Sequence, residues 1–182
     1  LFQHTGLSYL TITTLGQLLE MKTSQNPAYE NAKSLLMLPS LLNYWLTGIE
    51  RTEITIAGNT QLLNVNSRTW DTDILASFGI MPGLLPDLVS SGTLIGNTLP
   101  ASEEELDCAR LMVIAPACHD TACAAAAAPI NGSGCAIISC GTWSVIGKEL
   151  TLPLLSSLAL QKGYHNIQGA CNTYYFANYS IG

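Results

Sequence analysis

Two side chains capable of acid–base chemistry stand together in the stretch CHDTACAAAAAP, residues 118–129. The run at 111–115 before it is continuously apolar, which predicts a buried strand. The alanines after it favour a helix that Pro129 ends. Asp120 would then be the residue before a helix, where Asp is a preferred N-cap worth about 1 kcal/mol. A structural cap is therefore one interpretation of Asp120.

A catalytic role would use the same position. Ligands of open α/β sheets bind beyond the carboxyl ends of the strands. A carboxylate placed there can accept the proton of a substrate hydroxyl as that hydroxyl attacks phosphorus. His119 and Thr121, on either side of Asp120, add hydrogen-bonding groups that could hold a polyol. The two interpretations are compatible, because one carboxylate can cap a helix and serve as a base.

A second candidate stretch is SCGTWS, residues 139–144. Gly141 permits a tight turn and a close approach of the backbone to a ligand. The Thr142 hydroxyl and neighbouring N–H groups could then face phosphate oxygens. A base followed by a phosphate-facing hairpin predicts a two-part site for phosphoryl transfer.

Strands and helices alternate along the chain, which predicts the α/β class with a boundary near residue 130. Helices are expected after Pro27, from Pro39 to Thr47, over 70–79 between Asp71 or Thr72 and Gly79, after Ser102 as its cap, and near Asn172. A strand pair, or a strand and a loop, is expected over 52–65, and a hairpin joins 135–139 to 143–147.

The composition limits the possible partners. Charged residues make up 11% of the 182 residues and hydrophobic residues 48%, with a mean hydropathy of +0.28, so much of the surface is expected to be covered. The densest apolar stretch, 34–49, contains Pro39 and Asn43 and is shorter than the ~18–20 residues of a spanning helix, which favours core helices and no membrane. The net charge is −6 and the basic residues are scattered, which argues against a nucleic-acid partner.

The six cysteines allow two interpretations. Cys118 and Cys123 flank His119, and Cys135 and Cys140 repeat the same gap, which is wider than the usual C-x2-C zinc pair. Buried thiols of a cytoplasmic protein are the preferred interpretation. A zinc or thiol site on Cys118, His119 and Cys123 remains the alternative.

Five stretches in this order resemble the FGGY carbohydrate kinases, and among them the rhamnulokinase branch: LPSLLNYWLTG, TQLLNVNSRTWD, GI-P-LLPDLV-SGT-IG, HDTA and GTWSVIG. The resemblance extends from Gly6 to Gly147. It implies an actin-like, ribonuclease-H-like fold in two lobes with the substrate between them. Residues 1–129 would be the end of the first, sugar-binding lobe and 130–182 the beginning of the second, ATP-binding lobe. Leu1 is accordingly expected to be a cut end, and the fragment is expected to be inactive alone.

The resemblance also implies roles for individual residues. Asp120 matches the proton acceptor, and His119 and Thr121 match sugar contacts. Thr142, with Gly141 beside it, matches the ATP-contacting turn, and Asn178 matches an asparagine that contacts the ligands. The implied reaction is the transfer of the γ-phosphoryl group of ATP to the 1-hydroxyl of L-rhamnulose with Mg²⁺, without a protein ligand to the metal.

The chain departs from the family pattern at HNIQGA, residues 165–170, where Thr-Asn-Glu-Gly-Gly is usual. This difference removes an acid and a glycine from the second-lobe side of the site. The alternatives are a kinase for a related ketose such as L-fuculose, and a sugar-binding module without catalysis.

Overall fold

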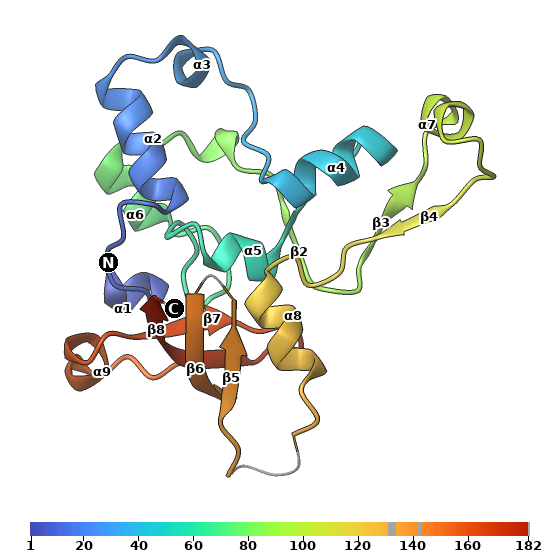
Figure 1. Ribbon diagram of the computed structural model, residues 1–182. Helices are drawn as coiled ribbons and strands as arrows, with labels where there is room; N and C mark the ends of the chain where they lie inside the picture. Colours follow the sequence, from blue (N-terminus) through green and yellow to red (C-terminus); the bar gives the residue numbers. More distant parts are fainter. Residues whose placement is uncertain (131–133, 142, 182) are drawn as a thin grey trace.

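The computed structural model describes residues 1–130, 134–141 and 143–181. Figure 1 shows helices predominating in the upper part and a four-stranded sheet in the lower part, with an arm extending to one side. The mixture of helices and sheets confirms the α/β class.

The largest core cluster lies among the helices of the first 85 residues. The elements that contribute to it are α2 (Thr14–Thr23), α3 (Pro27–Glu30), α6 (Thr72–Phe78) and the 3-10 turn η1 (Pro82–Leu84), and α1 (Phe2–Thr5) lies outside it. The helix expected over 70–79 is confirmed: the Asp71 side chain accepts a hydrogen bond from the Ile74 N–H at 2.9 Å, and Gly79 ends the helix at φ 61°. The buried side chains of this cluster are Leu15, Leu18, Tyr29, Leu62, Ile74, Leu75, Ile80 and Leu84.

Helix α4 (Leu38–Thr47) begins beside Pro39 and ends at Gly48, as predicted. Its assignment to the core is wrong, because its buried residues are Ser40 and Thr47 while Leu38 and Trp45 are 69% and 60% exposed. The physical reason is its neighbour: α4 packs against the thin two-stranded arm of β3 (Leu94–Asn97) and β4 (Met112–Ile114), which covers only part of its apolar surface.

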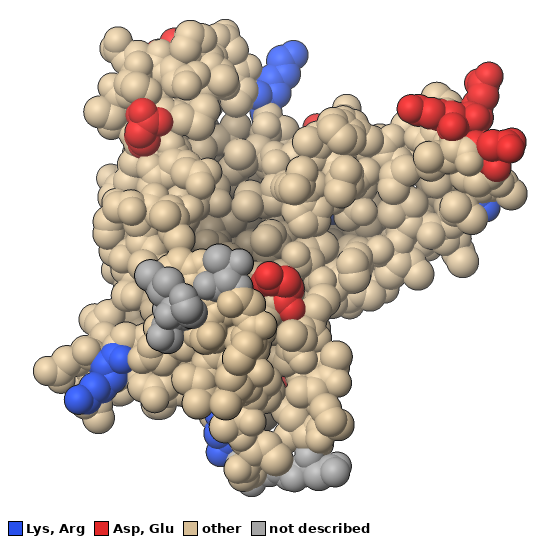
Figure 2. All heavy atoms as spheres, in the orientation of Figure 1, with Lys and Arg blue, Asp and Glu red and all other residues tan. Residues whose placement is uncertain are grey.

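The arm is formed by β3 and β4, which pair antiparallel, and by α7 (Pro100–Glu105). The strand expected at 111–115 is confirmed as β4, but its expected burial is wrong, since Met112 is 70% exposed and no third strand among the described residues pairs with β4. Helix α7 exists, but Leu99 rather than Ser102 is its cap, because Pro100 presets the helical φ at the first position. Its acidic side chains cluster at the tip of the arm (Figure 2).

The strand pair expected over 52–65 is also wrong. Strand β1 (Thr52–Glu53) is short and pairs in parallel with β2 (Leu88–Val89), and helix α5 (Ile54–Gly58) follows it directly. The Glu53 carboxylate caps α5 by accepting hydrogen bonds from the Thr55 and Ile56 N–H groups. This cap outweighs the β-branched side chains of TEITI.

The four-stranded sheet has the order β5-β6-β8-β7 and is antiparallel throughout. Its strands are β5 (Ile137–Cys140), β6 (Trp143–Leu150), β7 (Tyr164–Gln168) and β8 (Tyr174–Ile181), with α9 (Ser157–Gln161) before β7. The β5–β6 hairpin was predicted. The helix expected near Asn172 is wrong, because Asn172 has φ 58° in the turn that leads into β8.

Helix α8 (Asp120–Ala127) lies against this sheet (Figure 1). Ala125 packs in a core cluster with Ile137, Val145, Ile167 and Tyr175. The small alanine side chains thus let α8 approach the sheet closely. As a result, the HD turn at the start of α8 lies beside the strands that carry the other candidate residues.

Two further expectations bear on the surface. Within the described residues, the helices lack the combination of length and apolar character needed to cross a membrane. The expectation of buried thiols is wrong, because Cys123, Cys140 and Cys171 are exposed and Cys108, Cys118 and Cys135 are half-buried. Cys123 lies on α8, Cys140 is the last residue of edge strand β5, and Cys171 lies in the turn before β8.

Candidate functional site

A cavity of about 650 Å³ lies where α8, the segment 7–13 and the four-stranded sheet meet. One side, the α8 wall, consists of His119, Asp120 and Thr121. The facing side, the sheet wall, is built by Ser139, Gly141, Trp143, Val145, His165, Asn178 and Tyr179. The remaining lining residues are Leu7, Leu10, Ile12, Thr13, Asn59, Lys162 and Gly163.

Asp120 is the first residue of α8 rather than its N-cap, which corrects the sequence prediction. His119 is the residue before the helix, with extended backbone, because the chain becomes helical one residue earlier than expected. The Asp120 carboxylate accepts a hydrogen bond from the Thr121 N–H at 2.6 Å and is 95% exposed. It therefore lies in the first turn, where the helix dipole favours a negative charge, with its other oxygen open to a ligand.

The HD turn is fixed by a buried carboxylate from another part of the chain. Glu53, 2% exposed, accepts hydrogen bonds from the Cys118 N–H at 3.1 Å and from the Ser91 hydroxyl at 2.5 Å. The Thr55 hydroxyl, itself bonded to Glu53, accepts from the N–H groups of Cys118 and His119 at 3.0 and 3.1 Å. The α8 wall is thus positioned by the start of α5, and not by the carboxyl end of a strand in an open α/β sheet, as expected from the sequence.

His119 and Thr121 both face the Asp120 carboxylate. Nε2 of His119 lies 3.4 Å from Oδ1 of Asp120, and the Thr121 hydroxyl lies at the same distance from that oxygen. Burial lowers the pKa of His119, although the charges of Asp120 and Glu53 act in the opposite direction. Its Nδ1 is buried without a hydrogen-bond partner. A neutral imidazole carries one donor and one acceptor nitrogen, and Nε2, beside the Asp120 carboxylate, is the nitrogen suited to contact a hydroxyl-bearing ligand.

The sheet wall contains two of the predicted residues. Gly141 lies in the β5–β6 turn, and its N–H donates to the Trp143 carbonyl at 3.0 Å, so this N–H is not available to a phosphate. The Asn178 amide donates to the Lys162 carbonyl at 2.7 Å and holds the turn after α9 against β8. Thr142 lies outside the described residues.

Sequence reasoning missed several residues of this site. Tyr179 packs edge-on against both Trp143 and His165, with ring centroids 6.3 and 4.8 Å apart. Burial lowers the pKa of His165 to about 4 and raises the pKa of Tyr179. The alternation in FANYSIG was the available signal, since side chains two positions apart share a face of a strand. It was obscured by the expectation of a helix there.

Lys162 is also a lining residue that the sequence did not single out. It is the one Lys or Arg among the described lining residues of this cavity. A turn with Gly163 at φ 71° follows α9 and brings it there. The position supplies a cation to a cavity whose other described charge is Asp120.

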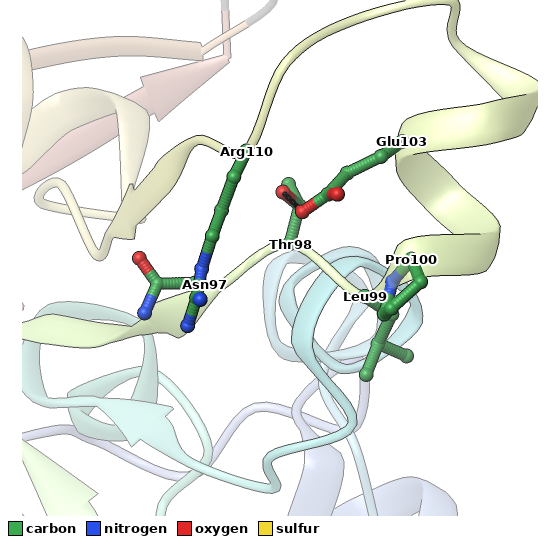
Figure 3. Close-up of a pocket in the computed structure, with 6 residues that line it drawn as sticks. All are labelled: Asn97, Thr98, Leu99, Pro100, Glu103 and Arg110. Atoms are coloured by element: carbon green, nitrogen blue, oxygen red, sulfur yellow. Dashed lines mark hydrogen bonds between the residues drawn. The ribbon is translucent and has the colours of Figure 1, made fainter.

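A smaller cavity of about 340 Å³ lies in the arm (Figure 3). Asn97, Thr98, Leu99, Pro100, Glu103 and Arg110 line it, and Thr98 donates to Glu103 at 2.8 Å. None of the predicted site residues belongs to it.

Among the described residues, Cys118, His119 and Cys123, the zinc site considered from the sequence, do not form a group with metal-binding geometry. The group with suitable geometry is His4, Asp71 and Asp73. Asp71 in this group already accepts hydrogen bonds from His4, Asn64 and Ile74, at 2.8, 2.8 and 2.9 Å. These bonds make it a structural cap and lower its pKa, against the opposing effect of its burial.

The comparisons with known proteins point in one direction. Residues 1–127 match the profile of the FGGY family of carbohydrate kinases, N-terminal domain. The chain is 37% identical to the rhamnulokinase of Enterococcus faecalis and 35% identical to that of Bacillus subtilis, over all 182 residues. It spans about 36% and 37% of the lengths of those two relatives.

Solved structures of sugar kinases share the fold. A xylulose kinase from Rhodospirillum rubrum superposes with a TM-score of 0.84 at 15% identity, covering 98% of this chain and 36% of that protein. A glycerol kinase from Plasmodium falciparum with ADP gives 0.82 at 18% identity, covering 98% and 36%. These superpositions confirm the predicted actin-like α/β fold, of which this chain covers a part. The profile match over residues 1–127 shows that the chain belongs to the FGGY family of carbohydrate kinases.

Proposed function

We propose that these residues form the sugar-facing part of an ATP-dependent kinase that phosphorylates the 1-hydroxyl of L-rhamnulose. The observation that carries the proposal is the Asp120 carboxylate, 95% exposed at the start of α8, in a cavity of about 650 Å³. His119, Thr121, Gly141 and Asn178 line the same cavity, although they come from distant parts of the sequence. The names of the curated relatives support L-rhamnulose over other ketoses.

The chemistry assigned to Asp120 is proton acceptance. As the sugar hydroxyl attacks the γ-phosphorus, its proton passes to the free carboxylate oxygen of Asp120. Glu53 and Thr55 hold the backbone of Cys118 and His119, which fixes where that oxygen lies. Since phosphoryl transfer depends mainly on positioning and charge stabilisation, this rigidity is part of the mechanism.

The sheet wall is assigned to ATP. The β5–β6 turn with Gly141 would lie beside the phosphates, and the Lys162 cation would offset part of their charge. Mg²⁺ bound to the phosphates would spread their negative charge. The described lining residues offer it one carboxylate, Asp120, which fits a metal held mainly by phosphate and water.

The two walls follow the proposed division of the chain. Residues 1–129 would belong to the sugar-binding lobe and 130–182 to the ATP-binding lobe, with the cavity between them. The chain would thus be an internal segment of a cytoplasmic kinase, inactive without the rest of it.

The test is the sugar-dependent release of ADP by the complete protein whose reading frame contains these residues, with Mg-ATP and either L-rhamnulose or L-fuculose. Asp120→Asn should lower turnover about 10²- to 10⁴-fold, while the protein stays folded because Asn can still accept the Thr121 N–H. Asp87→Asn is the matched control, since Asp87 is 81% exposed and pairs with Arg51 away from the cavity. Equal turnover in the Asp120 variant and the parent would reduce Asp120 to a structural residue.

A sugar-binding module without catalysis is the second candidate, and strand β7 favours it. The segment that lacks the family's usual acid is buried, and its side chains serve internal contacts: His165 bonds Ser8 at 3.2 Å, and Asn166 bonds both backbone groups of Leu154 at 2.7 and 3.1 Å. Calorimetric binding of L-rhamnulose that ATP does not alter, with no ADP release on any ketose, would establish this alternative.

A further inference from the structure

Two cysteines enclose the turn that carries Asp120. Cys118 lies one residue before the cap His119, and Cys123 is the fourth residue of α8. Side chains at these two positions pack against each other across the start of a helix, as in the hydrophobic staple. The sequence spacing alone therefore brings the two thiols to the same side of the HD turn.

The contacts of the two thiols agree with this placement. The Cys123 thiol donates to the Ala117 carbonyl at 2.8 Å, and the Cys118 thiol donates to the Pro116 carbonyl at 3.3 Å. Both thiols thus bond to carbonyls of consecutive residues in the irregular segment between β4 and α8. The Cys123 N–H donates to the His119 carbonyl at 3.0 Å, which anchors this thiol directly above the turn.

The environments of the two thiols differ. Cys123 is exposed, whereas Cys118 is half-buried beside Glu53. Burial raises the pKa of Cys118 to about 11, and the nearby charges of Glu53 and Cys123 add to this effect. Cys123 is therefore the thiol that meets a reagent from solution first, and Cys118 is the one that completes a reaction already begun.

We infer that Cys118 and Cys123 are a redox-sensitive pair whose oxidation to an intramolecular disulfide locks the turn bearing Asp120. The oxidant is a low-molecular-weight disulfide. The Cys123 thiolate, its proton lost to water, attacks one sulfur of that disulfide and displaces a thiolate. The Cys118 thiol then loses its proton to water, and the resulting thiolate attacks the Cys123 sulfur and displaces the second thiolate. Two protein thiols are oxidised, and one small disulfide is reduced to two thiols.

The disulfide would alter the site through the backbone. To meet, the sulfurs must leave the Pro116 and Ala117 carbonyls, while Glu53 and Thr55 continue to hold the backbone N–H of Cys118. The strain then falls on His119 and Asp120, which lie inside the closed loop. A displacement of about 1 Å at a catalytic group can lower turnover by about tenfold or more, so we expect at least that loss. This effect on turnover rests on the proposed kinase function, whereas disulfide formation does not.

The test treats the complete protein with oxidised glutathione and locates disulfides by tandem mass spectrometry without reduction. The expected result is a Cys118–Cys123 bond, a loss of turnover of about tenfold and full recovery with dithiothreitol. Cys123→Ser should keep the reduced activity and abolish both the bond and the inactivation. Cys171→Ser, which removes an exposed thiol on the turn before β8, is the matched control and should respond like the parent.

Two results would overturn the inference. One is the accumulation of glutathione adducts on Cys123 without a bond to Cys118, which would show that the thiols cannot meet. The other is a Cys118–Cys123 disulfide in a protein that turns over at the parent rate. If no variant shows sugar-dependent turnover, the disulfide is still read from the mass spectrum, so failure of the kinase proposal is distinguishable from failure of this one.

Discussion

The α8 wall of the cavity depends on one buried carboxylate, whereas the sheet wall depends on many backbone hydrogen bonds and packed rings. Glu53 holds Cys118 directly and His119 through Thr55. Tyr179, Asn178 and Trp143 lie on strands paired over their full length. One substitution can therefore displace the proposed base, while no single side chain determines where the opposite wall lies.

Glu53→Ala is the substitution with the largest expected effect on the α8 wall. The change leaves several buried donors without an acceptor, and each such donor costs about 1–3 kcal/mol. We expect a loss of about 4 kcal/mol in stability, together with a loss of turnover of about 100-fold from the displaced HD turn. Thermal unfolding and ADP release in the complete protein would measure both.

Glu50→Ala is the matched control, because Glu50 is exposed and lies three residues earlier on the same segment. It should leave both quantities close to those of the parent. If Glu53→Ala behaved like Glu50→Ala, the α8 wall would be held by something other than this carboxylate.

Local signals allowed the prediction of much of the fold. Asp71 and Gly79 delimit α6 because cap and stop both act within a few residues. The same holds for Gly48 at the end of α4. The strand pair expected at 52–65 failed because Glu53 finds partners at Ser91 and Cys118, which no local pattern reveals. Tertiary contacts thus decided the conformation where local propensity pointed elsewhere.

The site was predictable to a similar extent. His119, Asp120, Thr121, Gly141 and Asn178 line one cavity, as the resemblance implied, but their roles remain predictions. Lys162, His165 and Tyr179 were missed because they reach the cavity from three separate places: the turn after α9, strand β7 and strand β8. Site residues that a sheet brings together are harder to identify from the sequence than residues that are adjacent in a turn.

Lowering the pH should destabilise the protein through His165, a residue of the sheet wall. Its pKa of about 4 lies below the ordinary value of 6.5, so the unfolded chain binds a proton that the folded chain refuses. Stability should therefore fall by about 3 kcal/mol as the pH is lowered from 6.5 to 4, and stay level above 6.5. In His165→Gln this slope should be reduced, as measured by denaturant unfolding at a series of pH values.

Ser8→Ala serves as the control for this pH profile. It removes the hydrogen bond to His165 but leaves the imidazole able to titrate, so its slope should equal that of the parent. His119 contributes in the same direction and is present in all three proteins. A slope unchanged by His165→Gln would assign the acid sensitivity to other groups.

The smallest expected effect is that of Tyr175→Phe. Tyr175 belongs to the core cluster that packs α8 against the sheet. The Tyr175 hydroxyl is buried and donates to the Ile137 carbonyl at 2.6 Å, which joins β8 to β5 across β6. Losing one such bond costs about 1 kcal/mol, and the backbone ladder on both sides of β6 should keep the cavity in place. We therefore expect lower thermal stability with turnover within about twofold of the parent, since the displacement at the site is small. Tyr9→Phe, at a residue 57% exposed, should change neither. A loss of turnover in Tyr175→Phe as large as that in Glu53→Ala would mean that the sheet wall is as vulnerable to a single substitution as the α8 wall.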